Sequence, residues 1–141
     1  MNDDILEVAI RDYFAVATDA VRPMKVLIID DSEPVRRMIS SFLEDLVDEF
    51  VECEDGTEAL TAYFEHQPDI VLMDIKMNEM DGFRATGQIK EIFPSARIFI
   101  VSQWDTSDLR NLAKQSGADG YISKANLQPL RELIEGELKP S

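Results

Sequence analysis

Short apolar runs alternate with longer amphipathic stretches from residue 24 onward. The runs predict five strands, which cover Lys25–Ile29, Phe50–Cys53, Ile70–Met73, Ile98–Val101 and Tyr121–Ile122. Apolar residues at spacings of three and four predict helices between these strands and after the last one. One starts near Pro34, and the others cover Thr57–Phe64, Phe83–Ile92, Ser107–Gln115 and Leu127–Leu138. This alternation is typical of βαβ units around a parallel sheet, so we expect an α/β fold.

The first 23 residues are not part of this alternation of predicted strands and helices. They contain one apolar stripe at helical spacing, formed by Leu6, Ala9, Ile10, Tyr13, Ala17, Ala20 and Val21. We therefore predict a helical N-terminal extension over residues 1–23, followed by the main domain over residues 24–141. The extension either docks on its own domain, pairs two copies of the chain, binds a partner, or is dispensable with Met24 as the real start.

Length, charge and cysteine content narrow the class of protein. A chain of 141 residues with 45% hydrophobic residues suits one compact core. Its 28 acidic and 14 basic residues give a net charge of −14, which argues against binding to nucleic-acid phosphates or an anionic membrane. There is no secretory signal pattern and no apolar run near the ~20 residues that span a bilayer, so we expect a cytoplasmic protein. The single cysteine, Cys53, excludes an internal disulfide framework.

Polar side chains follow four of the five predicted strands. They are Asp30 and Asp31 after the first strand, Asp74 after the third, Ser102 after the fourth and Lys124 after the fifth. In an open parallel sheet, ligands bind beyond the carboxyl ends of the strands, so we expect these groups to converge. Singly, each has a plain structural explanation as a turn former, a cap or a solvated side chain. Their joint placement favours a functional site.

The residue types at this edge indicate phosphoryl chemistry. Clustered carboxylates repel one another unless a cation joins them, and an all-oxygen site suits Mg²⁺. Lys124 and the metal then supply the positive charge that a phosphoryl group requires. An ionised Asp74 attacks phosphorus without a general base and forms an acyl phosphate.

Four segments of the chain resemble the receiver domain of bacterial two-component response regulators. They are VLIIDDSEPVRRMI (26–39), DIVLMDIKMNEMDGFRA (69–85), IFIVSQW (98–104) and GADGYISKAN (117–126). The resemblance covers about residues 24–138. It implies a doubly wound, five-stranded parallel sheet of flavodoxin-like order 2-1-3-4-5.

The resemblance also implies a role for each site residue. It makes Asp74 the phosphoacceptor and one of the Mg²⁺ ligands, and it makes Ser102 and Lys124 the contacts of the phosphoryl oxygens. The remaining implied roles are Mg²⁺ binding by Asp30, Asp31 and the backbone carbonyl of Lys76, and a switch aromatic at Tyr121.

Some positions depart from the usual pattern of that family. Asn78 and Ala125 stand where prolines are common, and Gln103 stands where a small residue is usual. We hypothesise that Gln103 obstructs the phosphoryl pocket and that Lys76 pairs with a carboxylate, each changing the lifetime of the phosphorylated form. Trp104 lies in the loop after the fourth predicted strand, near enough to the site to act as a fluorescent probe.

These observations predict a single-domain response regulator. It takes a phosphoryl group from the phosphohistidine of a histidine kinase or phosphotransfer protein, and it catalyses its own phosphorylation and dephosphorylation without being a metabolic enzyme. Its output is phosphorylation-dependent binding to a downstream protein through residues 106–138, with no direct DNA binding, no membrane contact and a homodimer as one option. The chain ends soon after the last predicted helix, so we expect no second output domain.

Two other functions compete with this prediction. One is a receiver-fold adaptor that binds partners independently of phosphorylation, suggested by Gln103, Asn78 and Ala125. The other is a metal-dependent phosphohydrolase of the haloacid-dehalogenase type. That type needs a second aspartate two residues after the nucleophile, where this chain has Lys76.

Overall fold

A computed structural model describes residues 5–10 and 23–138 of the chain. Its centre is a parallel five-stranded sheet with the strand order β2-β1-β3-β4-β5, which confirms the predicted fold. The strands are β1 (Lys25–Ile29), β2 (Glu49–Cys53), β3 (Ile70–Met73), β4 (Ile98–Ser102) and β5 (Gly120–Ser123). Predicted and observed strands agree to within one residue at each end.

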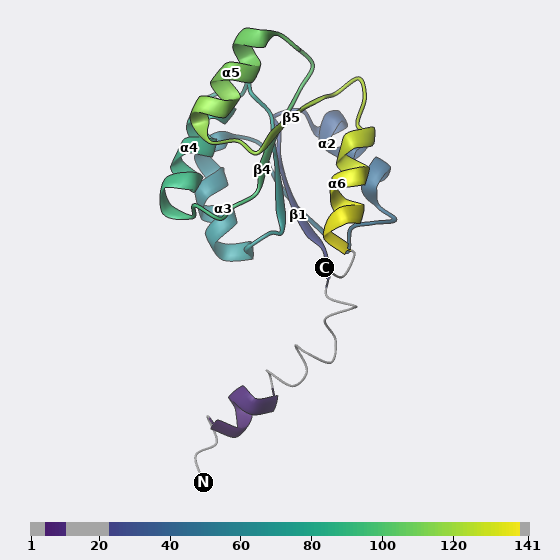
Figure 1. Ribbon diagram of the computed structural model, residues 1–141, viewed down its shortest axis with the longest axis vertical. Helices are drawn as coiled ribbons and strands as arrows, with labels where there is room; N and C mark the ends of the chain where they lie inside the picture. The colour runs from purple at the N-terminus through teal and green to yellow at the C-terminus, as the bar shows by residue number, and fades with distance from the viewer. Residues whose placement is uncertain (1–4, 11–22, 139–141) are drawn as a thin grey trace.

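Helices cover both faces of the sheet (Figure 1). α3, α4 and α5 lie on one face, and α2 and α6 lie on the other. The bounds are α2 (Glu33–Leu43), α3 (Ala59–His66), α4 (Gly82–Ile92), α5 (Ser107–Ser116) and α6 (Gln128–Leu138). The helix predicted from Thr57 differs at its start, because residues Gly56–Glu58 form a 3₁₀ turn, η2, ahead of α3.

Capping side chains place the helix starts just beyond the carboxyl ends of the strands. The Ser32 hydroxyl accepts a hydrogen bond from the Val35 amide at 3.3 Å and so caps α2. Asp81 caps α4 and Thr106 caps α5 in the same way. α5 ends at Ser116 and is capped by Gly117, whose φ of 96° lies in the left-handed region that glycine adopts without strain. These caps fix where each helix begins after the strand that precedes it.

Two apolar clusters, one on each face of the sheet, form the core. Val26 and Ile28 of β1 point into the cluster under α2 and α6, together with Leu130 of α6. Leu27 and Ile29 point into the other cluster, under α3, α4 and α5. Because strands buried on both faces read as unbroken apolar runs, the sequence pattern located β1, β3 and β4 well.

The N-terminal extension is described only in part. Residues 5–10 are helical, as predicted, and the side chains of Ile5, Leu6, Val8 and Ile10 are exposed. The rest of the predicted apolar stripe, from Tyr13 to Val21, lies outside the described residues. Among the helices of the described residues, none has the length and apolar character needed to span a membrane.

Candidate functional site

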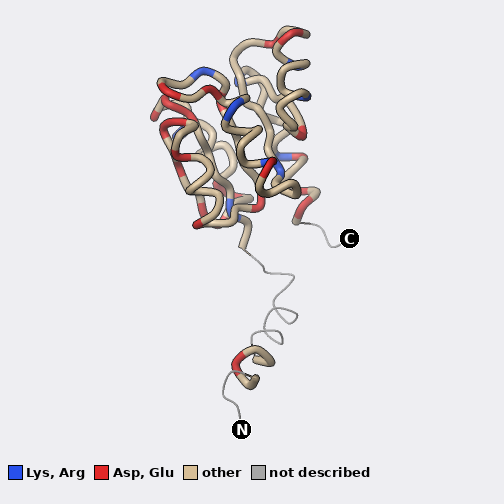
Figure 2. The backbone as a smooth tube through the Cα atoms, turned by 90° about the vertical axis from the view of Figure 1, so that its left-hand side faces the viewer, with Lys and Arg blue, Asp and Glu red and all other residues tan. Residues whose placement is uncertain are grey.

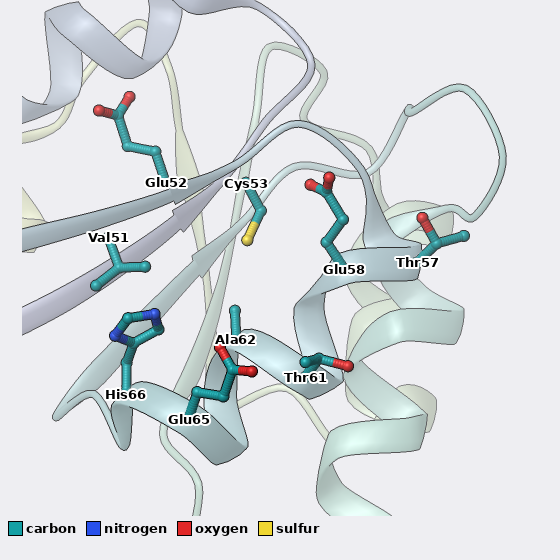
Figure 3. Close-up of a pocket in the computed structure, with 9 residues that line it drawn as sticks. All are labelled: Val51, Glu52, Cys53, Thr57, Glu58, Thr61, Ala62, Glu65 and His66. Atoms are coloured by element: carbon teal, nitrogen blue, oxygen red, sulfur yellow. The ribbon is translucent and has the colours of Figure 1, made fainter.

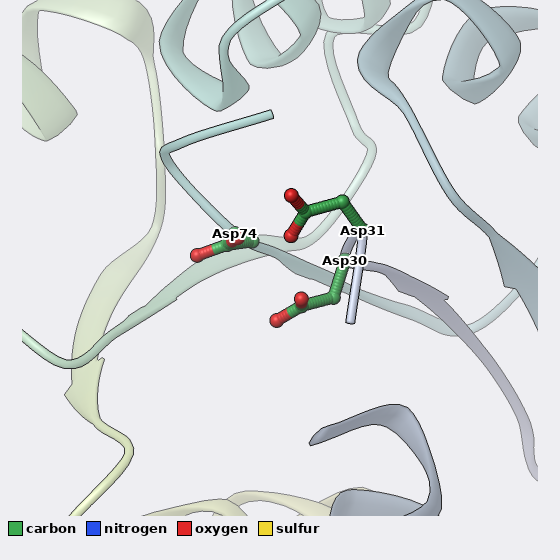
Figure 4. A group of neighbouring side chains, drawn as sticks. All are labelled: Asp30, Asp31 and Asp74. Atoms are coloured by element: carbon green, nitrogen blue, oxygen red, sulfur yellow. The ribbon is translucent and has the colours of Figure 1, made fainter. Parts of the chain in front are cut away.

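Three aspartates meet at the carboxyl edge of the sheet. β1 pairs with β3 in parallel register, with Ile29 opposite Met73, so the residues that follow both strands lie side by side. Ligand oxygens of Asp30, Asp31 and Asp74 all lie within 4.8 Å of one another (Figure 4). Asp30 and Asp74 are buried, whereas Asp31 is exposed. The structure therefore brings the predicted carboxylates together in one cluster that opens to solvent.

Lys124 joins this cluster from the end of β5. Its Nζ atom lies 2.9 Å from Asp30 Oδ2 and 3.1 Å from Asp74 Oδ1. The backbone amide of Lys124 donates to the Ser102 carbonyl at 2.8 Å, which ties the base of this side chain to β4. The ammonium group thus bridges two carboxylates that would otherwise repel each other.

Burial and charge shift the proton affinities of two of these groups. Burial raises the pKa of the Asp74 carboxyl, and the negative charge of Asp30 raises it further, so that together they outweigh the attraction of Lys124. Burial acts to lower the pKa of Lys124, but hydrogen bonds and charges from Asp30 and Asp74 outweigh it and leave that pKa raised. Lys124 therefore stays a cation beside an acidic group whose charge is costly.

Ser102 and Tyr121 are connected through one residue of the loop after β4. The buried Ser102 hydroxyl accepts a hydrogen bond from the Trp104 amide at 3.0 Å. The Tyr121 hydroxyl donates to the Trp104 carbonyl at 2.5 Å. The guanidinium group of Arg110 lies 4.9 Å from the centre of the Tyr121 ring, and Asp105 holds Arg110 at 2.6 Å. The predicted switch residue is thus held against the loop that begins at the predicted phosphoryl contact.

The three predicted modulator residues lie on the exposed side of the site. The ammonium group of Lys76 lies 5.4 Å from the centre of the Trp104 ring, a cation–π contact. Gln103 is exposed on the same loop as Trp104. Lys76 therefore contacts an aromatic ring where a carboxylate partner was hypothesised, and it links the loop after β3 to the loop after β4.

Gly82, which the sequence analysis did not single out, lies against the backbone of Asp74. A Cβ atom at Gly82 would lie 1.9 Å from the carbonyl oxygen of Asp74. The Gly82 amide donates to the Ile75 carbonyl at 2.8 Å, which closes the loop after β3. Gly82 is the first residue of α4, and the absence of a Cβ atom permits this close approach.

Two charged residues outside the predicted set also support this edge. The Asp55 carboxylate accepts hydrogen bonds from the amides of Glu79 at 2.9 Å and Met80 at 3.2 Å, which holds the loop after β3. Arg36 is buried and donates to the Asp30 carbonyl. Arg36 lies three and seven residues before Ile39 and Leu43, so it shares the buried face of α2, but a charged residue at that spacing looks like a polar interruption of the apolar face.

A separate hollow of about 450 Å³ lies between β2 and α3 (Figure 3). Its lining residues are Val51, Glu52, Cys53, Thr57, Glu58, Thr61, Ala62, Glu65 and His66. Burial raises the pKa of the Cys53 thiol to about 11, so this sulfur is an unreactive thiol at neutral pH. None of the aspartates at the carboxyl edge lines the hollow, which is therefore distinct from the candidate site.

Comparisons with known proteins agree with the geometry. Residues 26–135 match the family described as the response regulator receiver domain. The chain is 39% identical over 105 residues to the chemotaxis protein CheY of Halobacterium salinarum, covering 74% of this chain and 88% of the relative. It is 42% identical over 101 residues to the chemotaxis protein CheY of Bacillus subtilis, covering 71% and 84%.

Longer relatives and solved structures extend the comparison. The response regulator protein VraR of Staphylococcus saprophyticus is 38% identical over 104 residues, which is 72% of this chain but only 50% of that relative. The structure of Vibrio cholerae chemotaxis protein CheY4 has a TM-score of 0.73 and 26% identity, covering 81% of this chain and 98% of that one. The response regulator domain of Thermotoga maritima CheB has a TM-score of 0.72 and 26% identity, covering 85% and 99%.

Proposed function

The chain belongs to the response regulator receiver domain family, and from this premise we propose that Asp74 accepts a phosphoryl group from a phosphohistidine donor. The donor is a histidine kinase or a histidine phosphotransfer protein. The phosphorylated chain then changes its affinity for a downstream protein. One observation carries the proposal: Asp30, Asp31, Asp74 and Lys124 converge at a single edge of the sheet.

The donor set fits Mg²⁺. The side-chain ligand atoms of the three aspartates are carboxylate oxygens within 4.8 Å of one another, and Mg²⁺ prefers oxygen ligands together with retained waters. Asp30, Asp31 and Asp74 would hold the ion, with the backbone carbonyl of Lys76 as a further ligand. When bound, Mg²⁺ neutralises negative charge on the carboxylates and on the phosphoryl oxygens.

The residues of the chain perform the transfer by position and charge. A carboxylate oxygen of Asp74 forms the new bond to phosphorus while the P–N bond of phosphohistidine breaks, and that electron pair returns to the imidazole nitrogen. Lys124, already beside Asp74 and cationic, contacts a phosphoryl oxygen and balances its charge. Ser102 supplies a hydroxyl to another oxygen. Small phosphoryl donors use the same groups, so phosphorylation and later hydrolysis are self-catalysed.

The signal leaves through the surface formed by residues 106–138. Ser102 and Tyr121 are both hydrogen-bonded to Trp104, one to its amide and one to its carbonyl. A movement of Ser102 toward a phosphoryl group therefore pulls on the loop that holds the Tyr121 hydroxyl. Tyr121 acts as the switch that changes the surface of α5, β5 and α6.

The charge of the chain supports a protein as the downstream partner. The net charge is −14, and no Lys or Arg occurs between Arg37 and Lys76. Figure 2 shows acidic positions, in red, spread along the backbone with fewer basic positions, in blue, among them. Such a surface repels nucleic-acid phosphates and anionic lipids, so we infer an output by protein contact in the cytoplasm.

Intact-protein mass spectrometry tests the proposal. The chain is incubated with acetyl phosphate, with and without Mg²⁺, in parallel with Asp74→Asn and with Ser123→Ala as a control outside the carboxylate cluster. We expect a Mg²⁺-dependent gain of one phosphoryl mass in wild type and in Ser123→Ala, and none in Asp74→Asn. If neither acetyl phosphate nor a panel of histidine-kinase donors phosphorylates the wild type, the adaptor function replaces this proposal.

A further inference from the structure

Arg36 places a buried positive charge beside the acidic edge, yet it has no part in the phosphoryl transfer described above. It lies on α2, and only 7% of the residue is exposed. The adjacent Arg37 has a 71% exposed side chain paired with Glu33 on the surface of the same helix. A guanidinium group is seldom buried unless its hydrogen bonds are satisfied, so the partners of Arg36 indicate what it does.

The Arg36 guanidinium joins the end of β1 to the edge strand β2. Its Nη1 atom donates to the carbonyl oxygen of Asp30 at 2.6 Å. Its Nε atom donates to Glu52 Oε1 at 3.0 Å. β2 ends at Cys53, whose carbonyl accepts from the Asp30 amide at 3.1 Å. The sheet thus supplies a partner for the Asp30 amide, and the arginine supplies the partner for the Asp30 carbonyl.

Asp30 is consequently restrained at each of its polar groups. Its side-chain Oδ1 atom accepts from the Ser32 amide at 2.9 Å, and its Oδ2 atom lies 2.9 Å from Lys124 Nζ. These contacts orient the carboxylate, while Arg36 fixes the backbone from which the carboxylate projects. Removing the arginine frees the peptide unit that joins the two adjacent aspartates, Asp30 and Asp31.

We propose that Arg36 is a positioning residue for the Mg²⁺ site: it fixes the Asp30 peptide, and Glu52 orients the guanidinium group. This inference rests on the proposed function, because it concerns metal binding by the same carboxylates. It predicts that the identity of residue 36 changes Mg²⁺ affinity although residue 36 is not a ligand. Outer partners of metal ligands commonly act in this way.

The direction of the effect separates positioning from simple charge. Arg36 is a cation near a cation site, so loss of its charge alone would tighten Mg²⁺ binding. Loss of its positioning contact would weaken Mg²⁺ binding. Lysine keeps the charge but lacks the planar fork that reaches the Asp30 carbonyl and Glu52 together. Positioning therefore predicts weaker binding for both Arg36→Met and Arg36→Lys.

Isothermal titration calorimetry of the full chain with Mg²⁺ tests this inference, with Trp104 fluorescence as a second readout. We expect Arg36→Met and Arg36→Lys to raise the Mg²⁺ Kd about tenfold, the lower end of the range for outer partners of metal ligands. Glu52→Gln should also raise the Kd, but by less than Arg36→Met, and part of that rise follows from the loss of a negative charge near the cation site. Arg37→Met is the matched control on the same helix and should leave the Kd unchanged.

Circular dichroism establishes that each variant is folded before titration. If Arg36→Met does not fold, Arg36→Lys still decides the outcome, because it keeps the charge and changes only the geometry. If the wild type binds Mg²⁺ and the folded Arg36 variants bind it equally well or more tightly, this inference is wrong and the proposed metal site still stands. A wild-type chain that does not bind Mg²⁺ would overturn the proposed metal site and this inference together.

Discussion

The ammonium group of Lys124 lies 3.1 Å from Asp74 Oδ1 and so links the end of β5 to the end of β3, across β4. This contact does not fully offset the burial of Asp74 and its repulsion by Asp30, because the pKa of Asp74 is still raised. A charge that the fold tolerates at a loss of stability is typical of a functional site. It also makes the site sensitive to pH and to substitution.

Asp74→Asn should therefore stabilise the metal-free protein. A folded-state pKa above the ordinary 3.8 means that the folded chain binds more protons than the unfolded chain. The free energy of unfolding then falls as pH rises from 3.8 through the raised pKa, and it stays lowered at neutral pH. We expect Asp74→Asn to have a higher Tm than wild type at pH 7 in EDTA, with each ~1 kcal/mol of added stability appearing as about 3–4 °C. Thermal unfolding followed by circular dichroism measures it.

Mg²⁺ provides the control for that prediction. A cation bound by the carboxylate offsets its repulsion from Asp30, so saturating Mg²⁺ should raise the Tm of wild type more than that of Asp74→Asn. An Asp74→Asn protein that melts below wild type in EDTA would show that the Lys124 contact dominates the environment of Asp74.

Lys124→Met should destabilise the protein, and Asp74→Asn should reduce the loss. The Lys124 side chain is only 15% exposed and faces two buried carboxylates, so removing it leaves uncompensated negative charge. Breaking a buried pair in this way costs about 3 kcal/mol. In the Asp74→Asn background one of those charges is gone, so the same substitution should cost about 1 kcal/mol less. Urea unfolding of the four proteins in this double-mutant cycle measures the coupling, and purely additive losses would contradict it.

Gly82→Ala should damage both the fold and the site. The new Cβ atom would lie 1.9 Å from the Asp74 carbonyl oxygen and 2.9 Å from Met73 Cγ, so the loop after β3 must move. We expect a loss of about 3 kcal/mol in the free energy of unfolding and slower phosphorylation by acetyl phosphate.

Gly87→Ala is the matched control within the same helix. Nothing lies within 4 Å of a Cβ atom at Gly87, and alanine is the better helix former. This variant should be about 0.5–1 kcal/mol more stable than wild type. Equal effects of Gly82→Ala and Gly87→Ala in urea unfolding would contradict the close approach at Gly82.

The amino-acid pattern predicted the sheet and the convergence of its polar ends. Val26–Ile29 of β1 and all of β3 are unbroken apolar runs, and parallel strands place the residues that follow them at one edge, so the sequence alone identifies Asp30 and Asp74. Periodicity does not identify Arg36, because a charged residue on a buried helix face looks like a polar interruption. The contact between Lys76 and Trp104 joins two loops, and loops leave no periodic signal.

The environment of Cys53 predicts slow chemical labelling. The residue is 7% exposed, and burial raises the pKa of its thiol from 9.0 to about 11. At pH 8 the reactive thiolate fraction is then about a hundredfold lower than for a thiol of pKa 9.0. We expect a disulfide exchange reagent to label the native chain slowly and the urea-unfolded chain rapidly. Rapid stoichiometric labelling of the native chain would show that the hollow beside β2 opens to the sulfur.

The contact between Lys76 and Trp104 is expected to lengthen the lifetime of the phosphorylated form. It joins the loop that follows Asp74 to the loop that follows Ser102, and a cation–π contact at an exposed position contributes about 0.5–1 kcal/mol. If this contact keeps the two loops together over the site, its loss admits water to the acyl phosphate. Lys76→Asn should then dephosphorylate about threefold faster, which corresponds to ~0.7 kcal/mol.

Two further variants make that measurement specific. Lys76→Arg keeps a cation that can lie over the Trp104 ring and should dephosphorylate at a rate close to that of wild type. Gln103→Ala removes bulk from the exposed side of the same loop, so it should also speed the loss of phosphate if that bulk obstructs water. The decay of phosphorylated protein, followed by intact mass after removal of acetyl phosphate, gives all the rates. Trp104 emission should change in Lys76→Asn and not in Lys76→Arg. If the phosphorylated forms of Lys76→Asn and Gln103→Ala both decay at the wild-type rate, neither residue controls the phosphoryl lifetime.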